Sequence, residues 1–291
     1  MSQANKRNTA AALAILAAAA LWGMIGLWNR HLMAGGFTPY TIVLVRNMGG
    51  LVLLAAIFAV KDRSVFRVER CHLKYFFGTG VVSVLLFTVC YFSCQQVCSL
   101  AVASILLYTA PAIVVLLSAA LWKEPVTRKK LLALGLTLAG CALVTGVLSG
   151  GVTVTAQGVL LGLGAGFFYA LYSIFGRYAL AHYSAMTVTV WTFVFCGLGA
   201  LVFLRPGELA LVLERPSMAL LSLGLVVVST AAPYLLYTWG LAQVEPGRAA
   251  ILASIEPVVA SLVGVLAFGE PMTAMTAAGI VCVLAGVYIL R

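Results

Sequence analysis

Residues 103–125 read ASILLYTAPAIVVLLSAALWKEP, and residues 249–271 read AAILASIEPVVASLVGVLAFGEP. Both stretches are apolar, contain a proline and end on Glu-Pro. Each exceeds the roughly 20 residues that a helix needs to cross the hydrocarbon core of a bilayer. Neither alternates apolar and polar residues as a half-buried strand does, and only helices and closed barrels satisfy every backbone polar group in lipid. The two stretches therefore predict membrane-spanning helices.

The same apolar character continues along the whole chain. Of the 291 residues, 63% are apolar and only 9% are charged, whereas soluble domains carry roughly 25% charged residues. The apolar run that follows Lys6 and Arg7 is too long for a cleaved signal sequence and predicts an uncleaved first helix. We predict ten spans, at residues 9–29, 38–60, 73–95, 100–122, 129–148, 157–177, 184–204, 217–240, 249–268 and 273–290. The expected fold class is an all-α polytopic membrane protein.

The positions of Lys and Arg predict the orientation in the membrane. The net charge is +10, and the cations lie mostly in short segments between spans. One side would carry Lys6, Arg7, Lys61, Arg63, Arg67, Arg70, Lys74, Lys123, Arg128, Lys129, Lys130, Arg177, Arg248 and Arg291, and the other only Arg30, Arg205 and Arg215. Since cytoplasmic loops are rich in Lys and Arg, we expect a multi-pass protein of the cell membrane with both termini in the cytoplasm. This distribution indicates a lipid bilayer as partner and no nucleic acid.

The two opening stretches belong to an internal repeat. Residues 103–144 align with residues 249–290 without a gap, at an offset of 146, and 11 of the 42 pairs are identical. The pairs include Pro111 with Pro257, Glu124 with Glu270, Glu-Pro with Glu-Pro, and Gly140 with Gly286; at an offset of 147, Trp22 meets Tyr169 and Arg30 meets Arg177. We therefore divide the chain into residues 1–148, with helices 1–5, and residues 149–291, with helices 6–10.

Five is an odd number of spans, so the second unit would enter the membrane from the opposite face. Inverted repeats recur among secondary transporters, which bind substrate near the midplane between the halves. The pattern predicts a central cavity, a small-molecule substrate and transport by alternating access. Duplication without transport, as in a receptor or a scaffold, is the alternative.

In these features the chain resembles the EamA-type ten-helix members of the drug/metabolite transporter superfamily. The resemblance lies in two units of about 146 residues, the proline in each fourth helix, the Glu-Pro at its end and the glycine in each fifth helix. It implies helix bundles around a central cavity and movement of small metabolites, often outward. It also implies peripheral fifth and tenth helices with dimer contacts, which leaves room for a homodimer. The motifs leave the substrate open.

Two charges lie inside predicted spans, Arg46 in the second and Glu256 in the ninth. A charge at bilayer depth costs about 3 kcal/mol on insertion scales, so such residues tend to be functional. Facing a cavity, they would contact substrate or each other, or Glu256 would carry a proton. A satisfied ion pair without function, or an arginine that reaches the interface, is the alternative. Thr192 occupies the position of Arg46 in the second half, so the halves are not chemically equivalent.

Several aromatic and polar side chains share these spans. A hydroxyl without a partner is costly in lipid, so mid-span tyrosines are expected to face the interior rather than an interfacial belt. The predicted substrate-binding residues are Trp22, Arg46, Tyr91, Gln95, Tyr108, Tyr169, Tyr172, Tyr234, Tyr237 and Glu256. Pro111 and Pro257 each free a carbonyl one turn earlier and predict hinges or static kinks. Glu124 and Glu270 are expected to cap the following helix or to form gate contacts.

Enzyme signatures are absent from the sequence: it contains no GxSxG, HExxH or P-loop motif. The single aspartate, Asp62, falls in a loop, the three histidines lie near span ends, and the seven cysteines form no CxxC pair. We therefore expect no catalytic residue, no cofactor and no metal site. The leading hypothesis is a secondary transporter that exports small polar or amphipathic metabolites, amino acids and related compounds foremost. The alternatives are a multidrug exporter, a membrane enzyme acting on lipids, and a non-transporting scaffold.

Overall fold

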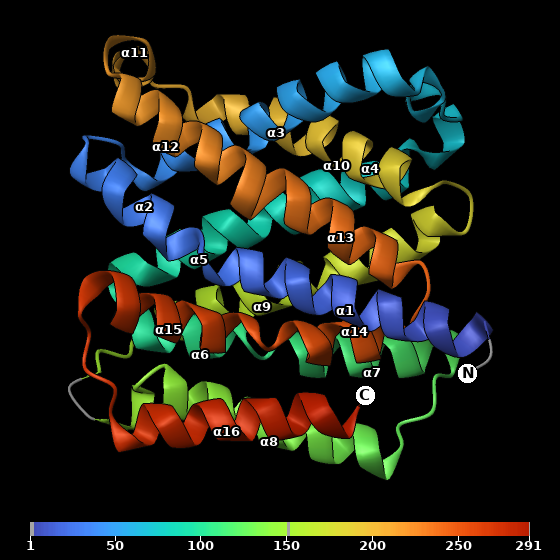
Figure 1. Cartoon of the computed structure of the whole chain (residues 1–291), viewed down its shortest axis with the longest axis vertical. Coiled ribbons are helices and arrows are strands. Elements are labelled where there is room, and N and C mark those ends of the chain that lie inside the picture. The colour runs from blue at the N-terminus through green and yellow to red at the C-terminus, as the bar shows by residue number, and fades with distance from the viewer. Residues whose placement is uncertain (1–2, 150–151, 291) are drawn as a thin grey trace.

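All regular elements in residues 3–149 and 152–290, the part of the chain that the computed structural model describes, are helical (Figure 1). The first half contains α1 (Gln3–Gly23), α2 (Ile25–Ala34), α3 (Pro39–Lys61), α4 (Leu73–Phe77), the π-helical segment Gly78–Leu85, α5 (Leu86–Val97), α6 (Leu100–Leu107), α7 (Ala110–Trp122) and α8 (Arg128–Val144). The second half contains α9 (Ala156–Leu180), α10 (Ala185–Ala200), α11 (Pro206–Glu214), α12 (Pro216–Val226), the π-helical segment Val227–Ala231, α13 (Ala232–Leu241), α14 (Pro246–Ala253), α15 (Glu256–Phe268) and α16 (Ala274–Ile289).

Several of these helices continue one another end to end. Within the described residues, eight continuous rods are long and apolar enough to cross a bilayer, among them α1 with α2, α6 with α7, and α14 with α15. The helices α8 and α16 are shorter, with 17 and 16 residues. The predicted fold class, an all-helical polytopic membrane protein, is therefore confirmed.

The predicted boundaries need two corrections. The predicted connection between Arg205 and Pro216 contains α11, a nine-residue helix that begins with a proline at its first position, where a missing N–H costs nothing. The first predicted span, 9–29, extends over residues 3–34 and is interrupted at Met24. The hydropathy of the sequence identifies only the apolar part of a helix, whereas the backbone hydrogen bonds of the helix continue beyond that part.

Four helices begin with side-chain caps that recur 146 residues apart. The Thr38 hydroxyl accepts a hydrogen bond at the start of α3, and the Ser184 hydroxyl does so at the start of α10. Thr127 and Thr273 cap α8 and α16 in the same way. The prediction that Glu124 and Glu270 cap these two helices is therefore wrong, because a threonine in extended conformation already occupies each N-cap position.

Interior breaks also recur at the same offset. The turn at Tyr108–Thr109 separates α6 from α7, and the turn at Ser254–Ile255 separates α14 from α15. Each break comes just before a proline, Pro111 or Pro257, whose ring nitrogen cannot donate to the preceding turn. The π-helical segments likewise end at Leu85 and Ala231, 146 residues apart, and widened helical turns are common near functional sites.

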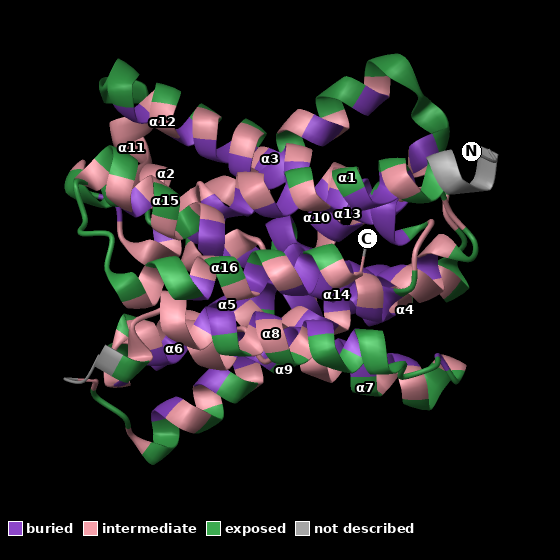
Figure 2. Cartoon of the chain, turned by 60° about the horizontal axis from the view of Figure 1, so that its bottom comes forward, coloured by how far each residue is buried: buried purple, intermediate pink, exposed green. Residues whose placement is uncertain are grey.

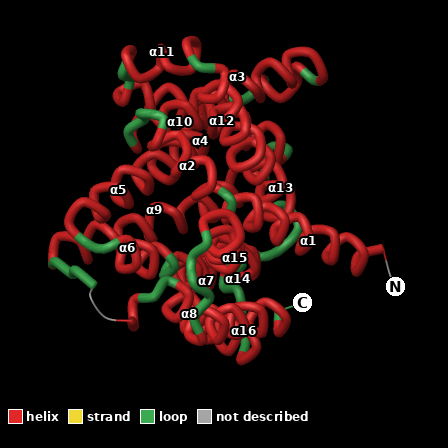
Figure 3. The backbone as a smooth tube through the Cα atoms, turned by 60° about the vertical axis from the view of Figure 1, so that its left-hand side comes forward, coloured by secondary structure: helices red, strands yellow, loops and turns green. Residues whose placement is uncertain are grey.

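Neighbouring helices come from opposite halves of the chain. The helices pack as α1 on α13, α5 on α9, α3 on α10, α7 on α14 and α8 on α16. The α8–α16 pair lies at one edge of the molecule (Figures 1 and 3). A β-carbon on Gly140 would lie 2.7 Å from the carbonyl oxygen of Gly279, so small residues allow this close packing, as is usual between helices in lipid.

Buried residues gather in the centre of the molecule, and exposed residues cover its periphery (Figure 2). Many exposed side chains are large and apolar, including Leu13, Val60 and Leu266, which suits contact with lipid. The start of α1 and the end of α16 lie toward the same end of the bundle (Figure 1). We call the face where α3 ends and α9 ends the terminal face, and the face where α2 ends and α3 begins the opposite face.

Candidate functional site

A cavity of about 390 Å³ lies among α1, α2, α3, α5, α6, α9, α13 and α15. This volume falls within the range of about 300–1,000 Å³ of small-molecule sites. Its inner end is lined by Tyr108, Tyr169, Tyr234 and Glu256, and its outer end by Arg30, Met33, Pro39 and Glu270. The outer set contains exposed residues at the ends of α2 and α15, so the cavity reaches the opposite face.

Most of the predicted binding residues line this cavity. They are Trp22, Arg46, Tyr91, Gln95, Tyr108, Tyr169, Tyr234 and Glu256. Tyr172 and Tyr237 do not line it; they line a pocket of about 20 Å³ beneath it, together with Trp22, Tyr169 and Tyr234. Glu270 lies at the cavity mouth, whereas Glu124, Pro111 and Pro257 are not among the lining residues.

Glu256 is the first residue of α15, directly after the break in that rod. Tyr169 donates a hydrogen bond of 3.4 Å to its Oε2, and the positive end of the helix dipole favours a carboxylate there. A β-carbon on Gly23 would lie 2.7 Å from the carbonyl oxygen of Glu256. The close approach of α1 thus fixes the backbone that presents this carboxylate to the cavity.

Arg46 reaches the same cavity from α3. Among the described residues, no carboxylate lies within ion-pair distance of its guanidinium, and its Nε is buried without a hydrogen-bond partner. The satisfied ion pair with Glu256 that was one alternative is therefore not formed in this structure. In the second half, Thr192 instead shares a 2.7 Å hydrogen bond with Thr79.

The rest of the cavity lining consists of hydroxyl, amide and aromatic groups. The hydroxyl groups of Tyr91 and Ser104 lie 3.2 Å apart, and the Oδ1 atom of Asn29 is buried without a partner in the described residues. Six further residues line the cavity without having been predicted from the sequence: Asn29, Arg30, Phe87, Phe92, Ser104 and Phe268. Arg30 and Phe268 correspond in the repeat to Arg177 and Trp122, which do not line the cavity, so the repeat alone does not indicate them.

At each face, one ion pair links the ends of two helices. Arg30 pairs with Glu270 at the opposite face, and Arg177 pairs with Glu124 at the terminal face. Each guanidinium also lies over an aromatic ring, Phe268 at 4.3 Å and Trp122 at 4.4 Å. The two arrangements correspond at the repeat offsets. They differ in environment, because the side chain of Glu270 is 46% exposed and that of Glu124 only 6%.

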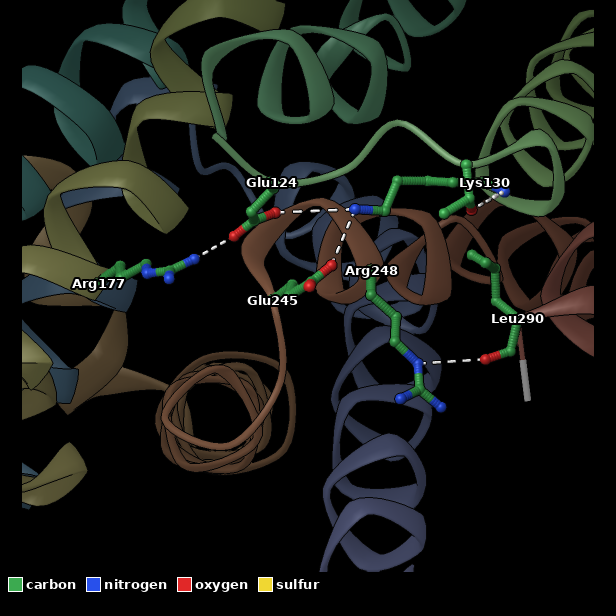
Figure 4. Close-up of polar contacts among 7 residues, drawn as sticks. Glu124, Lys130, Arg177, Glu245, Arg248 and Leu290 are labelled. Atoms are coloured by element: carbon green, nitrogen blue, oxygen red, sulfur yellow. Dashed lines mark hydrogen bonds and ion pairs between the residues drawn. The ribbon is translucent and has the colours of Figure 1, made fainter. Parts of the chain in front are cut away.

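The terminal face extends this pair into a chain of charges (Figure 4). The Nζ atom of Lys130 lies 3.7 Å from Glu124 and 2.9 Å from Glu245, and the lysine side chain is only 7% exposed. Nearby, Arg248 donates a 3.1 Å hydrogen bond to the carbonyl oxygen of Leu290. The chain Arg177–Glu124–Lys130–Glu245 therefore joins α9, α7, α8 and the start of α14.

Two hydrogen bonds between α9 and α13 close the cavity on its terminal side. The hydroxyl groups of Tyr172 and Thr238 lie 2.7 Å apart, as do those of Ser173 and Tyr237. The ring of Tyr234 lies 5.2 Å from the rings of both Trp22 and Tyr172. We call Tyr172, Ser173, Tyr237 and Thr238 the floor of the cavity.

One group of possible metal donors occurs at the terminal face of the described structure. Donor atoms of Glu69, Cys71 and His72 lie within 4.8 Å of one another. The sequence led us to expect no metal set among the three histidines, and this group contains only one of them. The Nδ1 atom of His72 already lies 2.8 Å from the Tyr183 hydroxyl, and its ring stacks on His182 at 4.3 Å. Glu69 and Cys71 are exposed, and we infer no metal site there.

Comparison with known proteins identifies the kind of molecule that carries this cavity. The model of the EamA-like transporter family matches residues 9–146 and again residues 156–291. The chain belongs to the EamA-like transporter family. It is thus a multi-pass membrane transporter and not an enzyme, and the recognised resemblance is confirmed.

Individual relatives of the family agree with this assignment. The chain is 34% identical over 279 residues to an uncharacterized transporter of Archaeoglobus fulgidus, covering 95% of this chain and 94% of that protein. It is 32% identical over 122 residues to the threonine/homoserine exporter RhtA of Escherichia coli, covering 41% of this chain and 40% of that protein. A crystal structure with 20% identity superposes with a TM-score of 0.78 over 97% of this chain and 96% of that chain, which shows the fold.

Proposed function

We propose that this protein is a secondary transporter that exports amino acids or closely related zwitterions by alternating access. The observation that carries the proposal is that Arg46 and Glu256 line one cavity without pairing with each other. A buried guanidinium stays charged and needs an anion at depth, since an unpaired buried charge is costly. The carboxylate and ammonium of an amino acid would supply one partner to each side chain.

The relatives support this substrate class. RhtA, which matches part of the chain, is named a threonine/homoserine exporter. The hydroxyl groups of Tyr91 and Ser104 and the amide of Asn29 offer partners for a polar substrate side chain. A volume of about 390 Å³ suits a small solute.

The transport mechanism that we propose uses ten spans in two inverted repeats, residues 1–148 and 149–291. The repeated caps, breaks and π-helical segments at an offset of 146 support this division. The excess of Lys and Arg on the terminal face supports a cytoplasmic position for that face. With this orientation, the cavity opens outward and the floor separates it from the cytoplasm. The homodimer suggested by the family resemblance stays a prediction.

Multidrug export is the second candidate. Aromatic rings of Trp22, Phe87 and Phe92 line the cavity and favour amphipathic ligands. The modest volume and the two charges are less typical of a wide, apolar drug site, so we rank it below amino acid export.

The experiment that tests the proposal is counterflow in proteoliposomes. The purified protein would be reconstituted, loaded with one unlabelled amino acid at a time, and supplied with the radiolabelled compound outside. Transient accumulation of at least one zwitterionic amino acid, absent from empty liposomes and reduced in Arg46→Gln, is the expected result. Accumulation of lipophilic cations, with no amino acid exchanged, would favour multidrug export instead.

A further inference from the structure

The cavity is closed on its terminal side and open toward the opposite face, and the contacts that close the terminal side have no equally strong counterparts on the other side. We propose that the protein without substrate is mainly open to the outside, because the contacts that close its cytoplasmic side have no equally strong counterparts on the outer side. The inference builds on the alternating access proposed above. It concerns the conformational equilibrium of the transporter, and it does not depend on which solute is carried.

The cavity lies between two sets of helices, which we call its walls and which pack on each other on the terminal side. The first wall is formed by α5, α6, α7 and α9, and the second by α1, α2, α13, α14 and α15; helices within each wall pack on one another. On the terminal side, α7 packs on α14 and α9 packs on α13. Toward the opposite face, α6 and α15 line the open cavity. Inward opening must therefore separate the walls at α7–α14 and at the floor.

The floor supplies the first closing contact. Tyr172 and Ser173 of the first wall bond through their hydroxyl groups to Thr238 and Tyr237 of the second wall, each at 2.7 Å. All four side chains are buried. Separating the walls on this side breaks both hydrogen bonds, and a buried hydroxyl left without a partner is costly.

The corresponding positions on the outer side cannot form these bonds. At the repeat offsets, Ile25 and Gly26 correspond to Tyr172 and Ser173, and Tyr91 and Phe92 correspond to Tyr237 and Thr238. All four outer residues line the open cavity. Closure of the outer side would bring Gly26 toward Tyr91 and Ile25 toward Phe92, and neither pair contains two hydroxyl groups.

The chain of charges supplies the second closing contact. Lys130 lies 3.7 Å from Glu124, which is on the first wall, and 2.9 Å from Glu245, which begins α14 on the second wall (Figure 4). Lys130 is buried. It therefore connects the two walls through an ion pair on each side, at a site where partial burial limits screening by salt.

The outer side lacks this connection as well. The positions that correspond to Lys130 and Glu245 hold Thr276 and Ser99, which carry no charge. The pair Arg30–Glu270 does exist at the outer face, but both residues belong to the second wall. It holds α2 to α15 and does not join the walls, just as Arg177–Glu124 holds α9 to α7 within the first wall.

The test compares two cysteine reporters that the repeat relates to each other. Ser104 lines the outer cavity, and the corresponding residue of the second half, Ala250, is buried between the walls. Each would be changed to Cys separately, and the rate of maleimide labelling at that site would be measured in purified protein by peptide mass spectrometry. The proposal predicts fast labelling at position 104 and slow labelling at position 250.

Three further variants, each combined with Ala250→Cys, test the cause. Glu245→Gln removes the partly exposed partner of Lys130 and should raise labelling at position 250 roughly two- to fivefold, the change expected for loss of one such ion pair. The double change Ser99→Glu with Thr276→Lys places an equivalent ion pair on the outer side. It should also raise the labelling rate at position 250. Lys129→Met, at an exposed neighbour of Lys130, is the matched control and should leave it unchanged.

Two results would overturn the inference. One is equal labelling at positions 104 and 250 in otherwise unchanged protein. The other is unchanged labelling at position 250 in both the Glu245 variant and the Ser99–Thr276 variant, each monodisperse on size-exclusion chromatography. Because labelling requires neither substrate nor transport, failure of the amino acid proposal would leave this outcome unaffected.

Discussion

Arg46 and Glu256 face one cavity from α3 and α15, and within the described residues they form no ion pair with each other. A pair of opposite charges in a membrane interior usually neutralises itself by direct contact. Here both side chains line the cavity, and the Tyr169 hydroxyl donates a 3.4 Å hydrogen bond to Glu256. This relationship is the basis of our proposal that the cavity binds a substrate with charges of both signs.

The stability of neutralised variants follows from this relationship. If the two residues were paired, each single change would leave one charge unpaired, and the double change would recover stability. Because they form no ion pair, we expect the double variant Arg46→Gln/Glu256→Gln to have a free energy of unfolding no higher than that of the more stable single variant. Denaturant titrations of the two single variants and the double variant measure this. A double variant more stable than either single one would indicate a pair.

The ion pairs at the two faces should differ in their contribution to stability. Glu124 is buried between Arg177 and Lys130, whereas Glu270 is half-exposed beside Arg30. We expect Glu124→Gln to cost about 3 kcal/mol, the low end for breaking a buried pair, because Lys130 keeps Glu245. Glu270→Gln, at the corresponding position, should cost less than about 1 kcal/mol. Equal losses in thermal unfolding would contradict the difference in burial.

The orientation in the membrane can be tested on a native cysteine. Cys71 is exposed at the terminal face, and the other six cysteines are buried or only partly exposed. An impermeant maleimide should leave Cys71 unlabelled in intact cells and label it in inverted vesicles. A cysteine placed at Val154, which is exposed near the opposite face, should react in intact cells. The reverse pattern would place the terminal face outside and would contradict the outward-open description of the cavity.

Glu208 of α11 should make stability depend on acid pH. Partial burial acts to raise the pKa of Glu208, but hydrogen bonds from the Thr38 backbone, the Thr41 and Thr38 hydroxyl groups and the charge of Arg205 together lower it below the ordinary value of 4.5. A pKa lowered by folding contributes stability that is present above the unfolded-state pKa and is lost as pH falls through the folded-state pKa. Glu208→Gln should therefore be less stable than the unchanged protein at pH 7, and the difference should shrink below pH 4.5. A constant difference across that range would exclude this role.

The sequence predicted those features that depend on local pattern. Apolar length indicated the spans, and the spacing of Pro111 with Pro257 indicated the repeat in which both breaks occur. The cost of a charge in lipid selected Arg46 and Glu256, which both line the cavity. These inferences needed only residue type and position along the chain.

Other features depended on packing between distant segments. The sequence could not tell that Tyr172 and Tyr237 belong to the floor rather than to the open cavity, because which side is closed depends on the relative position of the two walls. It also gave no sign that Lys130 would bridge Glu124 and Glu245, which lie on separate helices. The missed lining residue Asn29 has no unusual local pattern and reaches the cavity only through the continuation of α1 into α2.

The most direct test of the central claim measures which charge of the substrate each residue recognises. For an amino acid that the protein exchanges, counterflow would be inhibited with two analogues, one lacking the carboxylate and one lacking the ammonium group. We predict that the unchanged protein discriminates against both analogues, that Arg46→Gln no longer discriminates against loss of the carboxylate, and that Glu256→Gln no longer discriminates against loss of the ammonium group. Full discrimination against both analogues in both variants would show that neither residue binds the substrate, and it would contradict the account.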